Sequence, residues 1–201
     1  MFSLLPRVIP KTHARGAIKS YFYFSSRTRH RNTTKKKMEE TFDVDSLLPY
    51  DTCLVHGPRR DSRVDLVHML MLYMEHNSTE VFIFGNPKEG DRKIGGVYPQ
   101  QRFDRYSDEW LNIIYERQRA RINSSNASIS NGTSGAHLEG DGAVLLVFDN
   151  CIGSEEAKNS ELLQKLFCSG RFLRIGIIVC TEDPNDCTPA VRANITHVLR
   201  A

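Results

Sequence analysis

The stretch that decides the fold is Val144-Leu145-Leu146-Val147-Phe148-Asp149-Asn150. Its apolar residues follow one another without the alternation of a half-exposed strand, so we expect a strand that is buried on both faces. Such strands belong to parallel sheets that helices cover on both sides. Ligands in these sheets bind beyond the carboxyl ends of the strands, which is where Asp149 stands.

Apolar strands alternate with helical periods on both sides of this stretch. We expect strands at residues 52–55, 81–84, 143–148 and 175–180, with a candidate fifth at 195–199. A buried helix is predicted at 64–74, a second beginning at Ser107 with Trp110, Ile113 and Ile114 on its apolar face, and a third running from Ser154 to a stop at Gly170. The fold class is therefore α/β, with a mostly parallel sheet between two layers of helices.

Composition divides the chain into a basic tail and an acidic body. Of the 201 residues, 40% are hydrophobic, which suits one domain with a core. Residues 1–37 hold ten of the 27 Lys and Arg and none of the 24 Asp and Glu, so the rest has 17 basic against 24 acidic residues. No apolar run approaches the ~18 residues of a membrane helix, and a membrane partner is not expected. Five cysteines without a C-x-x-C pair favour reduced thiols.

The predicted domain boundaries follow from this division. Residues 1–40 form a basic tail or transit-like segment, and 41–201 form the folded domain, with a flexible loop at 123–142. The tail fits an organelle import signal, a nucleic-acid-binding arm, or a solvated extension without a role. Composition alone does not separate these three.

The first predicted strand ends in a degraded phosphate-binding turn. A phosphate-binding loop has the pattern G-x-x-x-x-G-K-[ST], in which the lysine neutralises phosphate and the hydroxyl holds Mg²⁺. Here Gly57 fits, while Ser62 stands for the second glycine, Arg63 for the lysine and Val64 for the hydroxyl. Taken alone this signal is weak, because a strand-to-helix turn with stray arginines explains it better.

The end of the central strand has the form of a Walker B motif. Asp149 would hold Mg²⁺, and the next residue, normally a second acid, would polarise the attacking water. Asn150 stands in that place and cannot accept a proton.

The order of short motifs resembles the DNA-packaging ATPases of large DNA viruses, the poxvirus-type branch of the FtsK–HerA superfamily. The segments that carry this resemblance are 148–150, 166–171, 177–181 and 189–194, with Tyr98-Pro99 ahead of them. The likeness covers roughly residues 51–201.

This resemblance implies a three-layer, RecA/FtsK-like P-loop NTPase fold that uses ATP and Mg²⁺. It implies ring oligomers that move double-stranded DNA into a capsid, with capsid or portal components as further partners. Arg171 and Arg192 are then candidates for the arginine that reaches a neighbour's γ-phosphate, although a surface arginine near a helix end or a loop explains each one singly slightly better. The polar sensor that ends the fourth strand of the family is replaced by Thr181-Glu182.

The departures from the family pattern all point to impaired hydrolysis. The turn lacks its lysine, hydroxyl and second glycine, and the Walker B pair lacks its second acid, so most of the electrostatic stabilisation of phosphoryl transfer is lost. The alternative is a catalytically inactive structural or interaction subunit that keeps the fold. A viral protein would act in the host cytoplasm or virion, whereas a captured host gene could use the tail for organelle import.

The hypothesis depends on one geometric expectation. The turn at 57–64 and Asp149 should meet at one edge of the same sheet, on neighbouring strands. The seven histidines show no metal-ligand spacing, and no G-x-S-x-G elbow is present, so other catalytic chemistry has little support.

Overall fold

The computed structural model describes residues 47–48, 50–58, 61–75, 80–85, 101–130 and 142–201. The basic tail, Tyr98-Pro99 and most of the predicted loop at 123–142 lie outside these residues. The described helices and strands follow one another in the order β1 (Thr52–His56), α1 (Asp61–Glu75), β2 (Glu80–Phe84), β3 (Arg102–Phe103), α3 (Asp108–Ser130), β4 (Val144–Asp149), α4 (Glu155–Lys158), α5 (Glu161–Ser169), η3 (Gly170–Leu173), β5 (Ile175–Thr181), η4 (Pro184–Asp186), α6 (Pro189–Ala193) and β6 (His197–Arg200).

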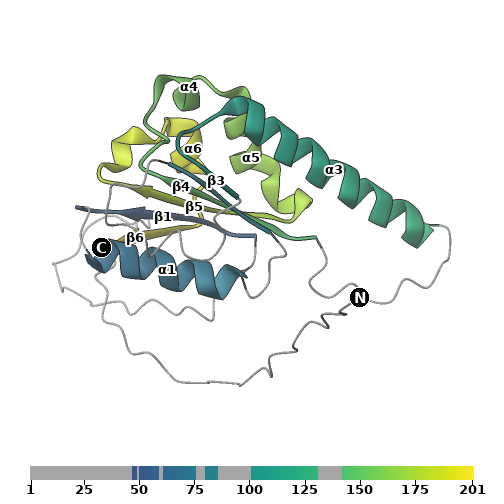
Figure 1. Ribbon diagram of the computed structural model, residues 1–201, viewed down its shortest axis with the longest axis horizontal. Coiled ribbons are helices and arrows are strands. Elements are labelled where there is room, and N and C mark those ends of the chain that lie inside the picture. The colour runs from purple at the N-terminus through teal and green to yellow at the C-terminus, as the bar shows by residue number, and fades with distance from the viewer. Residues whose placement is uncertain (1–46, 49, 59–60, 76–79, 86–100, 131–141) are drawn as a thin grey trace, which may run out of the picture.

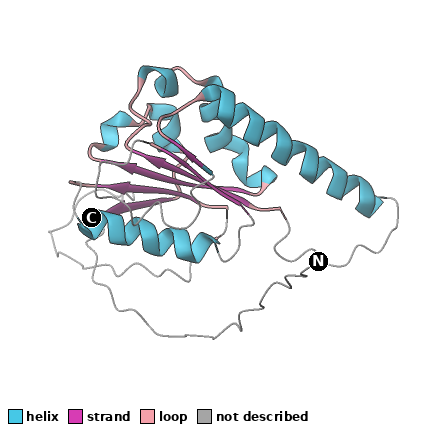
Figure 2. Cartoon of the chain, in the orientation of Figure 1, coloured by secondary structure: helices cyan, strands magenta, loops and turns pink. Residues whose placement is uncertain are grey.

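The strands form one six-stranded sheet in the order β3-β2-β4-β5-β1-β6. Every pair of neighbouring strands is parallel. Helix α1 covers one face, and α3, α5 and α6 lie on the other (Figures 1 and 2). The predicted α/β fold with helices on both faces is confirmed.

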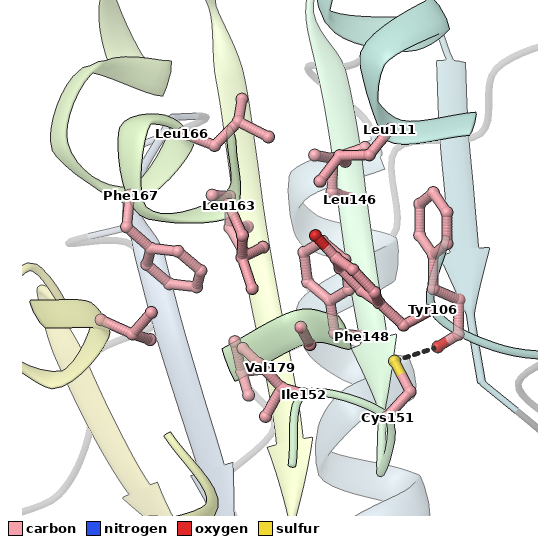
Figure 3. Close-up of a cluster of buried hydrophobic side chains, with 14 of the residues drawn as sticks. Tyr106, Leu111, Leu146, Phe148, Cys151, Ile152, Leu163, Leu166, Phe167 and Val179 are labelled. Atoms are coloured by element: carbon pink, nitrogen blue, oxygen red, sulfur yellow. Dashed lines mark hydrogen bonds between the residues drawn. The ribbon is translucent and has the colours of Figure 1, made fainter. Parts of the chain in front are cut away.

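Two buried clusters hold the layers together, because successive residues of a strand point to opposite faces. On the α1 side, Val55, Val147 and Cys180 pack with Leu66 and Leu70 of the helix. On the other side, aromatic and aliphatic side chains of the strands meet α3 and α5 (Figure 3). The labelled members of this second cluster are Tyr106, Leu111, Leu146, Phe148, Cys151, Ile152, Leu163, Leu166, Phe167 and Val179.

Helix α3 corrects two predictions. It continues to Ser130, so the flexible loop expected from residue 123 is wrong over 123–130. The hydroxyls of Ser124 and Ser125 donate to the carbonyls of Ala120 and Arg121, which satisfies these polar side chains within the helix.

The apolar face predicted for this helix is also partly wrong. Leu111, Ile114 and Tyr115 are buried, while Trp110 and Ile113 are about half exposed. Trp110 instead stacks on Phe103 at a centroid distance of 5.0 Å, on the short edge strand β3 that the sequence did not predict.

The helix expected from Ser154 to Gly170 is two helices. Ser154 caps α4 as predicted, but α4 ends at Lys158, and the hydroxyl of Ser160 accepts from the Leu163 amide to begin α5. Gly170 does not end the helical segment, because the 3-10 helix η3 follows it directly. The residue that ends η3 in a left-handed conformation is Arg174, at φ 56°.

Candidate functional site

The turn after β1 and Asp149 lie at the carboxyl ends of their strands, as expected, but those strands are not neighbours. Val55 of β1 and Asp149 of β4 both pair with Cys180 of β5, which therefore stands between them. Strands two places apart in a sheet are about 10 Å apart. The expectation of one edge of one sheet is confirmed, and the expectation of neighbouring strands is wrong.

Gly57 opens the turn after β1 in a conformation that favours glycine. Its φ is +143°, and a Cβ there would lie 2.6 Å from the carbonyl oxygen of Ala201. Its amide donates to the carbonyl of Thr181 at 3.2 Å, and Pro58 has no amide hydrogen to offer. Neither residue therefore presents a free N–H to a phosphate. Residues 59–60 and the side chain of Ser62 lie outside the described part.

Arg63 and Val64, which stand for the lysine and the hydroxyl, both face the protein. Arg63 is 2% exposed, and its Nη1 donates to the carbonyl of Gly57 at 2.9 Å. Val64 packs against the cluster on the α1 side. The guanidinium that the sequence predicts to face a phosphate is thus directed at the backbone of the turn itself.

Asp149 is 3% exposed at the last position of β4. Asn150 follows in a left-handed conformation with φ 50°, and its side-chain Nδ2 donates to Oδ1 of Asp149 at 3.2 Å. Burial raises the pKa of the Cys151 thiol to about 12, with the Asp149 charge as the second cause. The negative charge of Asp149 thus disfavours ionisation of the neighbouring Cys151 thiol.

The side chain of Thr181 is buried, and that of Glu182 is exposed. Thr181 is 1% exposed, and its hydroxyl contacts the carbonyl of Asp183 at 3.1 Å and the carboxylate of Asp186. Glu182 is exposed. The sensor position therefore holds the following loop in place.

The two candidate arginines lie apart from this edge or are held by their own loop. Arg171 is exposed on η3, directly before β5, and so lies at the amino end of the sheet, with its guanidinium 4.9 Å from the ring centre of Phe172. Arg192 on α6 donates from Nη1 to the carbonyl of Cys187 at 2.9 Å. Neither is brought to Gly57 or Asp149 within one chain.

The described residues do not fit a hydrolytic Mg²⁺–ATP site. Mg²⁺ prefers oxygen ligands, and the residues assigned to it supply the carboxylate of Asp149 but no hydroxyl at Val64. Among the described residues, no group of three or more His, Cys, Asp or Glu could hold a metal ion. The donors assigned to phosphate at Gly57 and Arg63 are already bonded within the chain.

Two further residues shape this edge. Gly85, which the sequence marks as the end of the second strand, follows β2 at φ +138°, and a Cβ there would lie 2.1 Å from the backbone oxygen of Asp149. Sequence reasoning missed Cys180, which lies between the two motif strands, because only the strand order could reveal it.

Two further observations concern membrane-spanning helices and the cysteine thiols. No helix in the described ranges is long and apolar enough to cross a membrane. Four of the five cysteines are buried and Cys168 is exposed.

Comparisons with known proteins give a likeness of fold. No protein-family model matches the chain, and no curated protein matches its sequence. The solved structure of the cytoplasmic domain of EssC matches with a TM-score of 0.55 at 12% identity, over 83% of this chain and 35% of that one. EssC (ATPases 2 and 3) from Geobacillus thermodenitrificans matches with a TM-score of 0.50 at 15% identity, over 76% and 32%.

A viral protein has the same likeness. The genome packaging NTPase B204 from Sulfolobus turreted icosahedral virus 2, in complex with AMP, matches with a TM-score of 0.50 at 14% identity, over 77% of this chain and 76% of that one. The chain spans about a third of the EssC chains and about three quarters of B204. The predicted resemblance is thus confirmed at the level of the fold: the chain has the α/β fold of these P-loop NTPases.

Proposed function

We propose that this chain is a subunit of a DNA-packaging type of assembly that keeps the P-loop NTPase fold but does not turn over ATP itself. The fold shared with B204 and the order of the strand-end motifs support the packaging type. In such an assembly the subunit would contribute to an oligomeric ring, to contacts with double-stranded DNA and to contacts with capsid or portal components.

One observation carries the loss of turnover. The described polar groups assigned to ATP are bonded within the chain: Arg63 to Gly57, Thr181 to its following loop, and Asn150 to Asp149. A phosphoryl-transfer site needs donors aimed at the charge that develops on the phosphate, and these donors are aimed elsewhere. Asn150 also cannot take a proton from water.

The second candidate is a subunit that does not bind ATP at all. The inward position of Arg63 favours it, because a triphosphate bound at the turn would have to be neutralised by other charges. The first candidate allows binding without hydrolysis, and the two differ in this respect alone.

Titration of the full chain with a fluorescent ATP analogue and Mg²⁺, together with a phosphate-release assay, tests the proposal. We expect no phosphate release above that of the Asp149→Asn variant. Release by the wild type that Asp149→Asn abolishes would overturn the proposal. Saturable binding without release identifies the first candidate, and no binding at millimolar nucleotide identifies the second.

A repaired variant provides the matched positive control. Ser62→Gly, Arg63→Lys, Val64→Thr and Asn150→Glu together restore the groups that the family pattern requires. Sedimentation velocity with and without Mg²⁺–ATP, and a duplex-DNA mobility shift, then test assembly. We expect oligomer and DNA complex in the absence of ATP. A strictly monomeric chain that does not bind duplex DNA would count against the packaging assembly.

A further inference from the structure

An aromatic ring is exposed at the corner where η3 follows α5. Phe172 is 69% exposed, the largest fraction among the exposed large hydrophobic side chains of the described residues. The guanidinium of Arg171 lies over this ring, 4.9 Å from its centre. A planar cation and an exposed ring together offer positive charge and a flat surface on which another planar group can stack.

The chain around this ring is basic. Residues 165–174 contain Lys165, Arg171 and Arg174 and no Asp or Glu. Lys165 and Arg171 are exposed, and Arg174 is partly exposed directly before β5. Three cations therefore lie within ten residues of one another, on the stretch that carries Phe172.

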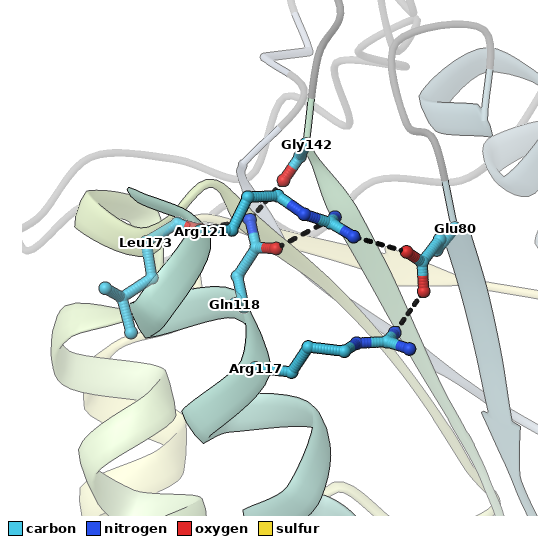
Figure 4. Close-up of polar contacts among 6 residues, drawn as sticks. All are labelled: Glu80, Arg117, Gln118, Arg121, Gly142 and Leu173. Atoms are coloured by element: carbon cyan, nitrogen blue, oxygen red, sulfur yellow. Dashed lines mark hydrogen bonds and ion pairs between the residues drawn. The ribbon is translucent and has the colours of Figure 1, made fainter. Parts of the chain in front are cut away.

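The second half of α3 adds arginines to the same corner. The buried side chain of Gln118 donates to the carbonyl of Leu173 in η3 at 2.8 Å, so this part of the helix lies against η3 (Figure 4). Arg117 and Arg119, on either side of Gln118, are exposed, and Arg121 is partly exposed. The corner thus combines cations from two segments that are distant in the sequence.

Acidic residues balance only part of this charge. Glu80 pairs with two of the α3 arginines, and Glu116 pairs with the third. The six cations of this corner still outnumber the acids when Glu139 and Asp141, which lie outside the described residues, are added to these two. The remaining positive charge favours an anionic partner.

We infer that the corner formed by η3 and the second half of α3 binds single-stranded nucleic acid, with a base stacked on Phe172 and the neighbouring phosphates bound by Arg171 and the other cations. Sites for single strands combine cations that follow the backbone with aromatic rings on which bases stack. Bases inside a duplex are stacked on one another, so an exposed ring favours unpaired bases. The inference goes beyond the proposed function, which concerns duplex DNA, and it requires no bound ATP.

Fluorescence anisotropy of a labelled oligothymidylate of about 20 nucleotides, titrated with the full chain, tests the role of the ring. Phe172→Ala removes a ring that is mostly in solvent, so we expect the fold to persist and the Kd to rise at least about five-fold. Phe172→Tyr keeps a ring and should bind as the wild type does. The Kd for a duplex of the same length should be unchanged in both variants.

Arg171→Gln tests the phosphate contact. Loss of one such contact should weaken single-strand binding and reduce the slope of log K against log salt by about 0.7. Two matched controls lie near the other end of α3, among acidic residues. Trp110→Ala removes an exposed aromatic ring beside Asp108 and Glu109, and Arg105→Gln removes an exposed arginine. Both should leave the Kd and the salt slope unchanged.

The basic tail is tested separately, because residues 1–37 also carry ten cations. Lys35→Gln, Lys36→Gln and Lys37→Gln together should weaken single-strand and duplex binding by the same factor, since they change charge and no ring. The five-fold effect of Phe172→Ala should persist in that background. Its disappearance there would assign the bound strand to the tail and overturn the inference.

Three other results would also overturn it. These are a Phe172→Ala variant that binds the single strand like the wild type, an equal loss in Trp110→Ala, and equal losses on single strand and duplex. Labelled poly-glutamate that binds as tightly as the oligonucleotide and is weakened equally by Phe172→Ala would assign the corner to an acidic protein instead. ATP and Mg²⁺ are absent from these titrations, so turnover by the wild type would refute the proposed function and leave this result standing.

Discussion

The hydrogen bonds that join separate elements at the two ends of the parallel sheet come from different groups. At the amino end, α3 reaches across the starts of other strands: Arg117 and Arg121 bind Glu80 of β2, and Gln118 donates to the carbonyls of Gly142 and Leu173 (Figure 4). These partners are 24 to 55 residues apart in the sequence.

At the carboxyl end, the side-chain bonds of the candidate residues are short-range. Arg63 binds Gly57 six residues earlier, Thr181 binds Asp183 two residues later, and the side chain of Asn150 binds the residue before it. Backbone amides join these turns to other elements, since Gly57 donates to the Thr181 carbonyl and Asn150 donates to the Cys180 carbonyl. A change of side chain leaves these backbone bonds in place, so motif residues can be lost there while the fold persists.

The two segments that follow β4 and β5 at the carboxyl end are acidic. Residues 149–160 and 181–187 carry six acidic residues and one basic residue. These are Asp149, Glu155, Glu156, Glu182, Asp183 and Asp186, with Lys158. The negative charge on these two segments disfavours a triphosphate beside them.

The largest effect on stability is expected from replacing one glycine with alanine at each end of the sheet. Gly85→Ala places a Cβ 2.1 Å from the backbone oxygen of Asp149 at φ +138°, so we expect a loss of more than about 3 kcal/mol in the free energy of unfolding. Gly142→Ala at the amino end meets the flexible side chain of Arg121 at 2.8 Å and should cost about 1–3 kcal/mol. Urea unfolding measures both, and equal losses would contradict the distinction between backbone and side-chain neighbours.

The next effect tests the long-range contacts of α3. Gln118 is 1% exposed, and Gln118→Leu leaves the carbonyls of Gly142 and Leu173 without this donor, so we expect a loss of about 2–4 kcal/mol. Asn112→Leu changes an exposed residue of the same helix and serves as the control, with a change within about 0.5 kcal/mol. Thr181→Val at the carboxyl end should cost less than Gln118→Leu, because its partners lie in one short loop. The reverse order would refute the comparison.

Much of the fold could be predicted because its signal is local. Uninterrupted apolar runs ended at glycine or at acidic residues, and each predicted strand is present within about two residues. The edge strand β3 was missed because two residues carry no periodicity. The buried side of α3 was misassigned because Trp110 finds its partner, Phe103, on that missed strand.

The candidate site shows a sharper limit. The sequence placed Gly57, Arg63 and Asp149 at the correct strand ends, since parallel strands share a carboxyl edge. It could not give the direction of the Arg63 side chain or the strand that separates β1 from β4. Both depend on tertiary packing that no short motif encodes.

A smaller effect is expected from the ion pairs at the amino end. Glu80→Gln weakens the contacts with Arg117 and Arg121, whose side chains are 49% and 36% exposed, so we expect a loss of about 0.5–1 kcal/mol that shrinks in ~1 M salt. Glu116→Gln removes an exposed pair with Arg119 and should have no measurable effect. Urea unfolding at low and high salt distinguishes them. A loss for Glu80→Gln that salt does not reduce would assign the contact to packing.

The smallest effect concerns pH at the carboxyl end. Burial lowers the pKa of His56, and the nearby Arg200 lowers it further while Asp183 partly opposes both. Below about pH 6.5 the unfolded chain therefore binds a proton that the native His56 resists, so its contribution to stability is complete above that pH and declines as the pH falls.

Replacing the imidazole isolates this contribution. His56→Gln should reduce the loss of stability between pH 7.5 and pH 5.5 by well under about 1 kcal/mol, because the side chain is partly solvated. Paired thermal scans of the wild type and the variant across this range measure the difference. A variant that loses more stability than the wild type on acidification would mean that native His56 gains a proton more readily than the unfolded chain, contrary to the cationic influence of Arg200.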